Sequence, residues 1–168
     1  MRRFLLLLLC VAALVSAKTP RPLPDLTLAV PPGLKATKLN QFPGKVLVIA
    51  VFSTECEPCA TAVQYLDRLQ KEYKDKGVQM MAGAANNGAI SLVGPFVDRY
   101  KVTIPVGVLT EAEAQRLTDS GPRDHLLVPA FLFVDKKGQI RFQFPGNDKF
   151  FDDGDKNTRR VIADLLSH

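Results

Sequence analysis

Two cysteines lie three positions apart in this 168-residue chain, in the sequence Cys56-Glu57-Pro58-Cys59. An apolar, β-branched run before them predicts a strand, and apolar residues at helical spacing after them predict a helix. Cys56 would then stand at a helix N-terminus, where unpaired N–H groups and the positive end of the helix dipole stabilise a thiolate. We therefore expect a reversible disulfide with Cys56 as the nucleophile. Cys59, one turn later and more buried, would attack the mixed disulfide and release the partner.

Pro58 fits the first turn of the predicted helix, where its missing N–H has no partner to lose. A C-x-x-C pair can also be half of a zinc site, which needs further Cys or His ligands. Outside residues 1–17 the chain offers only His125 and His168. Because of this shortage of ligands, we predict no metal centre and no cofactor.

Residues 1–17 have the pattern of a secretory signal peptide. A pair of arginines precedes an unbroken apolar stretch over residues 4–15, and Val15-Ser16-Ala17 supplies the small residues that signal peptidase recognises. The stretch is shorter than the roughly 20 residues that a permanent membrane span needs, so an uncleaved anchor is the alternative. Cys10 would be removed with this segment. We expect a periplasmic or otherwise extracytoplasmic protein, in a compartment where disulfides persist.

Residues 18–168 should form one domain, because domains commonly hold about 100–200 residues. The chain is 46% hydrophobic and 23% charged, which excludes a disordered chain and a multi-span membrane protein. Its formal net charge is +5, but basic and acidic residues alternate, so no nucleic-acid partner is expected. A disulfide that closes so short a loop adds little stability, so its chemistry is the better reason for its presence.

The predicted elements alternate between strands and helices. Proline-rich residues 18–32 should be extended, with a short edge strand at 26–28. A buried strand over 45–52, a helix over 60–76 and a strand over 78–82 give a β-α-β unit with parallel strands. A hairpin, or a strand and turn, is predicted over 33–44, helices over 92–100 and 111–118, and a strand over 106–109. Strands 130–135 and 139–144 should form a hairpin, and the second strand should have one exposed face. A C-terminal helix should follow, capped within 152–155.

Two segments resemble the TlpA/ResA branch of the thioredoxin-like superfamily, which is related to the AhpC/TSA proteins. They are IAVFSTECEPC at 49–59 and VPAFLFVDKKGQI at 128–140, and the element order extends the resemblance over about 24–166. The resemblance implies an α/β thioredoxin-like three-layer fold, with a central mixed β-sheet flanked by helices and an N-terminal extension. It also implies that Pro129 is a cis-proline facing the disulfide and that the Val128 backbone pairs with an extended substrate segment.

The function that this resemblance implies is thiol-disulfide exchange with extracytoplasmic protein thiols or disulfides. Such a protein would act as a reductant, supplied with electrons by a membrane or soluble redox donor, as in cytochrome c maturation. We also expect a monomer. The fold alone does not choose among reductases, oxidases and isomerases.

The chain departs from the family pattern around the motif. Glu55 precedes the first cysteine where the family usually has Trp, and the chain contains no Trp. A carboxylate there would raise the pKa of Cys56 and oppose the helix dipole. Ala50 and Ala62 stand where related proteins carry a buried acid, so the usual proton-relay residue is not visible. Glu57 is a candidate substitute, although a solvated glutamate is the ordinary role.

Two other functions stay open at this point. A peroxidase of the peroxiredoxin type would need Pro at position 49 and Thr or Ser at position 53. The chain has Ile49 and Ser53, so only the second position fits. A copper-binding chaperone would use Cys56 and Cys59 as thiolate ligands and His125 as a third, with a surface histidine as the ordinary alternative. Consumption of hydrogen peroxide and titration with copper would distinguish these functions.

Overall fold

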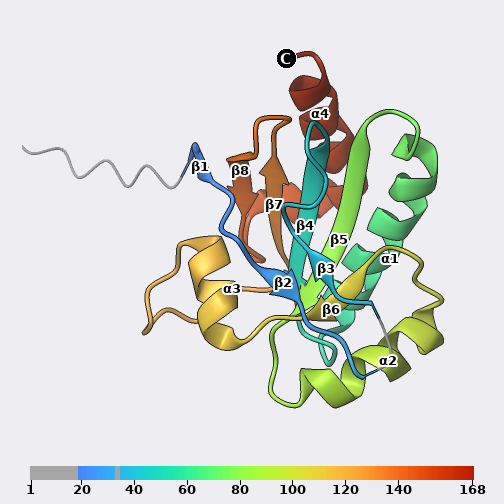
Figure 1. Cartoon of the computed structure of the whole chain (residues 1–168), viewed down its shortest axis with the longest axis vertical. Coiled ribbons are helices and arrows are strands. Elements are labelled where there is room, and N and C mark those ends of the chain that lie inside the picture. Colours follow the sequence, from blue (N-terminus) through green and yellow to red (C-terminus); the bar gives the residue numbers. More distant parts are fainter. Residues whose placement is uncertain (1–18, 33–34) are drawn as a thin grey trace, which may run out of the picture.

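The computed structural model describes residues 19–32 and 35–168, so the predicted signal peptide or anchor at 1–17 lies outside the described residues (Figure 1). Its centre is a six-stranded sheet in the order β1-β8-β7-β4-β5-β6, beside a separate two-stranded sheet of β2 and β3. The elements are β1 (Arg21–Pro22), β2 (Thr27–Leu28), β3 (Thr37–Lys38), β4 (Val46–Phe52), α1 (Glu57–Tyr73), β5 (Val78–Ala84), α2 (Ala89–Tyr100), β6 (Val106–Val108), α3 (Glu111–Thr118), β7 (Ala130–Val134), β8 (Gln139–Phe144), the 3-10 helix η1 (Lys149–Asp153) and α4 (Gly154–Leu166).

Strand β4 lies in the middle of the sheet, and all of its residues are buried. It pairs in parallel with β5 and antiparallel with β7, so the sheet is mixed as predicted. Successive side chains of a strand point to opposite faces, and the run of apolar residues fills both. Val48 and Ala50 join the core on one face, whereas Leu47 and Ile49 join the core on the other.

Helices cover both faces of the sheet and complete the three layers. The core that contains Val48 also contains apolar residues of α1, α2 and α4. The opposite core contains residues of α3 and three leucines of the N-terminal extension, Leu26, Leu28 and Leu39. Figure 1 shows α3 on the other side of the sheet from α1. The predicted thioredoxin-like arrangement with an N-terminal extension is therefore confirmed.

The N-terminal strands differ from the prediction. The strand predicted at 26–28 pairs with Thr37–Lys38 in the small second sheet, so it is not an edge strand of the central sheet. That edge is β1, which pairs with Gln139 and Ile140 of β8. An edge strand tolerates Pro22 because one of its sides needs no N–H donor. Helix α2 also begins earlier than predicted, directly after Gly88, whose φ of 71° is left-handed.

The predicted capping of the last helix within 152–155 is wrong. Asp148, outside that range, caps the preceding η1 by accepting a 2.7 Å hydrogen bond from the N–H of Phe150. Asp153, which precedes α4, makes no side-chain capping bond, because η1 runs directly into α4 and leaves no extended capping residue (φ −142°, ψ 64°). Asp155 instead pairs with Arg159 at 2.7 Å.

Strand β8 exposes less of its second face than its alternation predicts. Only Arg141 is exposed, and the other polar positions are half-buried. Gln143 is covered by β1, because Arg21 donates a 2.7 Å hydrogen bond to its side-chain oxygen. The pairing of β8 with β7 also shifts register between Phe133 and Val134, which interrupts the simple alternation.

Candidate active site

The sulfurs of Cys56 and Cys59 are joined in a disulfide with a Cα–Cα distance of 5.1 Å. Cys56 is the N-cap of α1, and its Sγ accepts a 3.2 Å hydrogen bond from the backbone N–H of Cys59. Cys56 is half-buried, whereas Cys59 is fully buried in the core beneath α1. Cys56 is therefore the more accessible cysteine of the pair.

The first turn of α1 explains why the motif folds in this way. Pro58 lies in this turn, where an N–H has no intrahelical acceptor, and the helix begins when Ala60 donates a 3.0 Å bond to the carbonyl of Cys56. Glu57 is in the same turn and complements the positive end of the helix dipole. The side chains of Glu55 and Glu57 are exposed, and within the described ranges neither makes a hydrogen bond or an ion pair.

The turn before Cys56 is bound to the end of the neighbouring strand through Asn86. Its side-chain oxygen accepts a 3.0 Å hydrogen bond from the N–H of Thr54, and its side-chain nitrogen donates a 3.0 Å bond to the Thr54 hydroxyl. No motif in the sequence singles out Asn86. The signal that could have found it is topological, because β4 and β5 are parallel and Phe52 lies opposite Ala84. Residues just after both strands must therefore meet at one edge.

The peptide bond between Val128 and Pro129 is cis, as the family resemblance implied. Val51 of β4 lies opposite Ala130 of β7, so Pro129 is at the same edge of the sheet as the disulfide. Pro129 is buried, whereas Val128 is half-buried and packs on the same core as Cys56. The structure thus brings both predicted segments to one edge of the sheet.

Gly146 packs closely against the segment that contains the cis-proline. Its N–H donates a 2.8 Å bond to the carbonyl of Leu127, and a Cβ at Gly146 would lie 2.6 Å from the carbonyl oxygen of Val128. We expect Gly146→Ala to push this segment away, with a loss of about 1–3 kcal/mol of unfolding free energy and slower disulfide exchange. Urea denaturation and an exchange assay would measure both effects. Gly94→Ala is the control, because no atom lies within 4 Å of a Cβ there; equal behaviour of the two variants would contradict the prediction.

A buried acid is present in α1, but its carboxylate binds residues away from the cysteines. Asp67 is 5% exposed and is the only buried charged side chain of the described residues. Its carboxylate accepts bonds from the Thr103 hydroxyl (2.8 Å) and the Ile104 N–H (3.0 Å) and pairs with Lys71 at 3.1 Å. Burial acts to raise the pKa of Asp67, but these hydrogen bonds outweigh it and hold the pKa below its usual range. Asp67 therefore ties α1 to the segment before β6.

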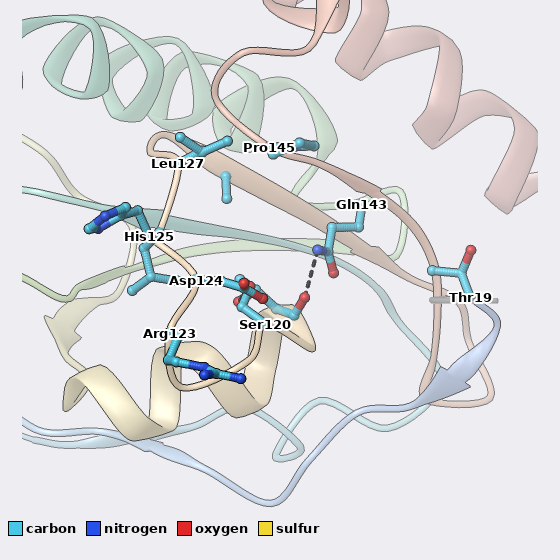
Figure 2. Close-up of a pocket in the computed structure, with 11 residues that line it drawn as sticks. Thr19, Ser120, Arg123, Asp124, His125, Leu127, Gln143 and Pro145 are labelled. Atoms are coloured by element: carbon cyan, nitrogen blue, oxygen red, sulfur yellow. Dashed lines mark hydrogen bonds between the residues drawn. The ribbon is translucent and has the colours of Figure 1, made fainter. Parts of the chain in front are cut away.

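His125 is exposed on the loop before β7 and borders a surface cavity of about 590 Å³. Figure 2 shows it with Arg123 on one side of this cavity, opposite Gln143 of β8 and Thr19. Within residues 19–32 and 35–168, no three His, Cys, Asp or Glu side chains are grouped so that they could hold a metal ion. The structure therefore does not bring His125 together with the two cysteines.

No helix among the described residues is long and apolar enough to cross a bilayer.

The layer order, the cis-proline and the disulfide at the start of α1 define a thioredoxin-like fold. Over residues 18–159 the chain matches the Redoxin family, and it belongs to that family. The fold is similar to that of a thiol:disulfide interchange protein, a thioredoxin family protein from Chlorobium tepidum TLS. The TM-score is 0.72 at 18% identity, and the match covers 88% of this chain and 97% of that one. The thioredoxin domain of a thiol-disulfide oxidoreductase from Bacteroides vulgatus gives a TM-score of 0.65 at 19% identity, covering 86% of this chain and 97% of that domain.

Sequence relatives carry the name thiol-disulfide oxidoreductase ResA. The protein of that name from Oceanobacillus iheyensis is 31% identical over 103 residues, which are 61% of this chain and 50% of the relative. The one from Bacillus cereus (strain ATCC 10987 / NRS 248) is 29% identical over 112 residues, which are 67% of this chain and 61% of the relative. The matched region therefore spans only about half to three-fifths of the length of these relatives.

Proposed function

We propose that this chain is an extracytoplasmic thiol-disulfide oxidoreductase that reduces disulfides of protein partners through Cys56 and Cys59. The observation that carries the proposal is the disulfide at the start of α1, with one sulfur half-buried and the other fully buried. The activity in the names of the ResA relatives supports it. The location and the role in cytochrome c maturation rest on the signal-like residues 1–17 and on the family resemblance.

The reaction begins from the reduced pair. The Cys56 thiolate attacks one sulfur of a partner disulfide, the partner's S–S bond breaks, and the second partner sulfur leaves as a thiolate that takes up a proton. Cys59 then loses its proton and attacks the Cys56 sulfur; the mixed disulfide breaks, the Cys56–Cys59 bond re-forms, and the partner sulfur that was bound to Cys56 leaves as a thiolate that takes up a proton. Two electrons pass from the chain to the partner, and a membrane or soluble redox donor must return them.

In this proposal Val128 and Pro129 bind the extended partner segment. Val128 ends the loop before β7 and is half-buried, and we expect its backbone to pair with another chain at the edge where Cys56 lies. Glu55, Glu57 and Pro58 surround Cys56 at the surface and modulate its reactivity. The structure offers no observation that favours the copper chaperone or the peroxidase over this function.

The reduction potential of the cysteine pair tests the proposed direction. After equilibration with glutathione or thioredoxin buffers, we expect a value of about −270 mV or lower, as for a reductant. A value near about −120 mV would make the chain an oxidant instead. A pair that exchanges with neither buffer, or rapid consumption of hydrogen peroxide, would overturn the proposed activity itself.

A further inference from the structure

We infer that Asn86 is a positioning residue for Cys56, which sets the reactivity of this sulfur by holding the turn of residues 53–55 against the end of β5. The inference rests on the proposed function in that it concerns the same nucleophile. It assigns a role to a residue that lies 30 positions after Cys56 and that no sequence pattern marked.

The bonds between Asn86 and Thr54 are reciprocal. The amide oxygen of Asn86 accepts from the Thr54 N–H at 3.0 Å, and its amide nitrogen donates to the Thr54 hydroxyl at 3.0 Å. The same nitrogen donates to the carbonyl of Asn87 at 3.2 Å, which fixes the orientation of the amide. The adjacent Ala85 donates from its N–H to the carbonyl of Phe52 at 2.9 Å, so the backbones of the two strand ends are also joined.

Other hydrogen bonds of this turn are internal to it. Cys56 donates from its N–H to the Ser53 carbonyl at 3.2 Å, and Glu55 donates from its N–H to the Ser53 hydroxyl at 3.3 Å. In the described part of the chain, only Asn86 joins residues 53–55 to a distant segment by hydrogen bonds. The turn would lose its external hydrogen-bond anchor if this amide were removed.

Packing does not replace that anchor. A surface cavity of about 190 Å³ lies between the turn and α2. The turn borders it with Thr54 and Glu55, and α2 borders it with residues that include Leu92, Pro95 and Arg99. Side chains next to a cavity lack contacts there, so packing against α2 adds little support on this side of the turn.

The position of the turn affects the reactivity of Cys56 because it sets the distance between the Cys56 Sγ and the N-terminus of α1. The sulfur lies 3.2 Å from the Cys59 N–H, and both this hydrogen bond and the helix dipole favour the thiolate of the reduced protein. These contributions fall off within the first turn of a helix. If the turn shifts, Cys56 moves away from the N-terminus of α1. The thiolate is then less stabilised, although neither cysteine has been changed.

The test is the rate at which iodoacetamide alkylates Cys56 in the reduced protein as a function of pH. In Asn86→Ala we expect alkylation at pH 7 to be about three- to tenfold slower, with the midpoint of the pH profile shifted upward. Asn157→Ala is the matched control, because the Asn157 amide also donates to a backbone carbonyl, that of Phe150 at 2.8 Å, but in α4. Its pH profile should equal that of the unaltered protein.

A second pair of variants keeps the test decisive if Asn86→Ala does not fold. Thr54→Val removes the hydroxyl that Asn86 binds but keeps the backbone N–H, so it should give a smaller shift in the same direction, whereas Thr54→Ser should behave as the unaltered protein. An unchanged profile in Asn86→Ala, or equal shifts in Asn86→Ala and Asn157→Ala, would overturn the inference. Because alkylation needs no partner, this result is separate from the exchange assay that decides the proposed function.

Discussion

Replacement of Cys56 by serine should abolish disulfide exchange, with a fall of at least about 100-fold in the rate at which a protein disulfide is reduced. The half-buried sulfur of Cys56 is the one that a partner can reach, and a serine hydroxyl is not ionised at neutral pH. Turbidity from the reduction of insulin disulfides would measure the rate. Thr61→Ala, an exposed substitution one turn later in α1, should leave the rate unchanged.

Replacement of Cys59 by serine should give a different defect. Cys56 can still attack a partner disulfide, but no second sulfur is present to release the partner. A mixed disulfide should therefore accumulate and be visible on a non-reducing gel, and it should disappear on addition of dithiothreitol. Exchange at the normal rate in either cysteine variant would contradict the assigned roles.

The largest loss of stability is expected for Asp67→Ala. The substitution removes the acceptor for the Thr103 hydroxyl and the Ile104 N–H, and it leaves this buried backbone donor unpaired. We expect the free energy of unfolding to fall by about 2–4 kcal/mol, since hydrogen bonds to charged groups are among the stronger ones. Urea denaturation would measure the loss. Asp98→Ala is the control, because Asp98 is exposed and should change stability little.

The same carboxylate should make stability depend on acid pH. A pKa held below its usual range in the folded state means that the ionised carboxylate stabilises the fold above the pKa of the unfolded chain, about 3.9 for Asp. This stability is lost as the pH falls through the folded-state pKa. Asp135 should contribute in the same direction. Burial acts to raise its pKa, but hydrogen bonds from the Gln139 N–H, the Arg141 side chain and the Lys137 N–H outweigh this effect and lower the pKa. Asp67→Asn should flatten the loss of stability below about pH 4, near the pKa of an unfolded Asp; an unchanged slope would contradict this account.

Local sequence patterns were sufficient where the structure is decided locally. The continuous apolar run over 46–52 requires a sheet covered on both faces, and the helical spacing after Cys59 requires an amphipathic helix, so the centre of the fold followed. Gly138, with a φ of 75°, marks the turn of the last hairpin where the sequence placed it. The disulfide and the cis bond at Pro129 were expected from motifs that lie entirely within short segments.

Features that depend on contacts between distant segments could not be predicted in the same way. Asn86 contacts Thr54 across 32 positions, and Asp67 contacts Thr103 across 36. Neither residue type is unusual in its own neighbourhood, so its role becomes visible only after the strands and helices are placed. The failed cap within 152–155 has a related cause, since the acidic residues fit the pattern but η1 removes the backbone geometry that a cap requires.

In the proposed reaction, the surroundings of Cys59 decide how long a partner stays covalently attached to Cys56. Apolar residues pack around this residue, and Ala50 and Ala62 are among them. Asp67, the one buried carboxylate of the described residues, is bound to Thr103 and Ile104. In the proposed reaction the Cys59 thiol loses its proton in these apolar surroundings, which disfavour a negative sulfur. In the proposed reaction we therefore expect release of the partner to be slower than its capture, and alkaline conditions to shorten the life of the covalent intermediate.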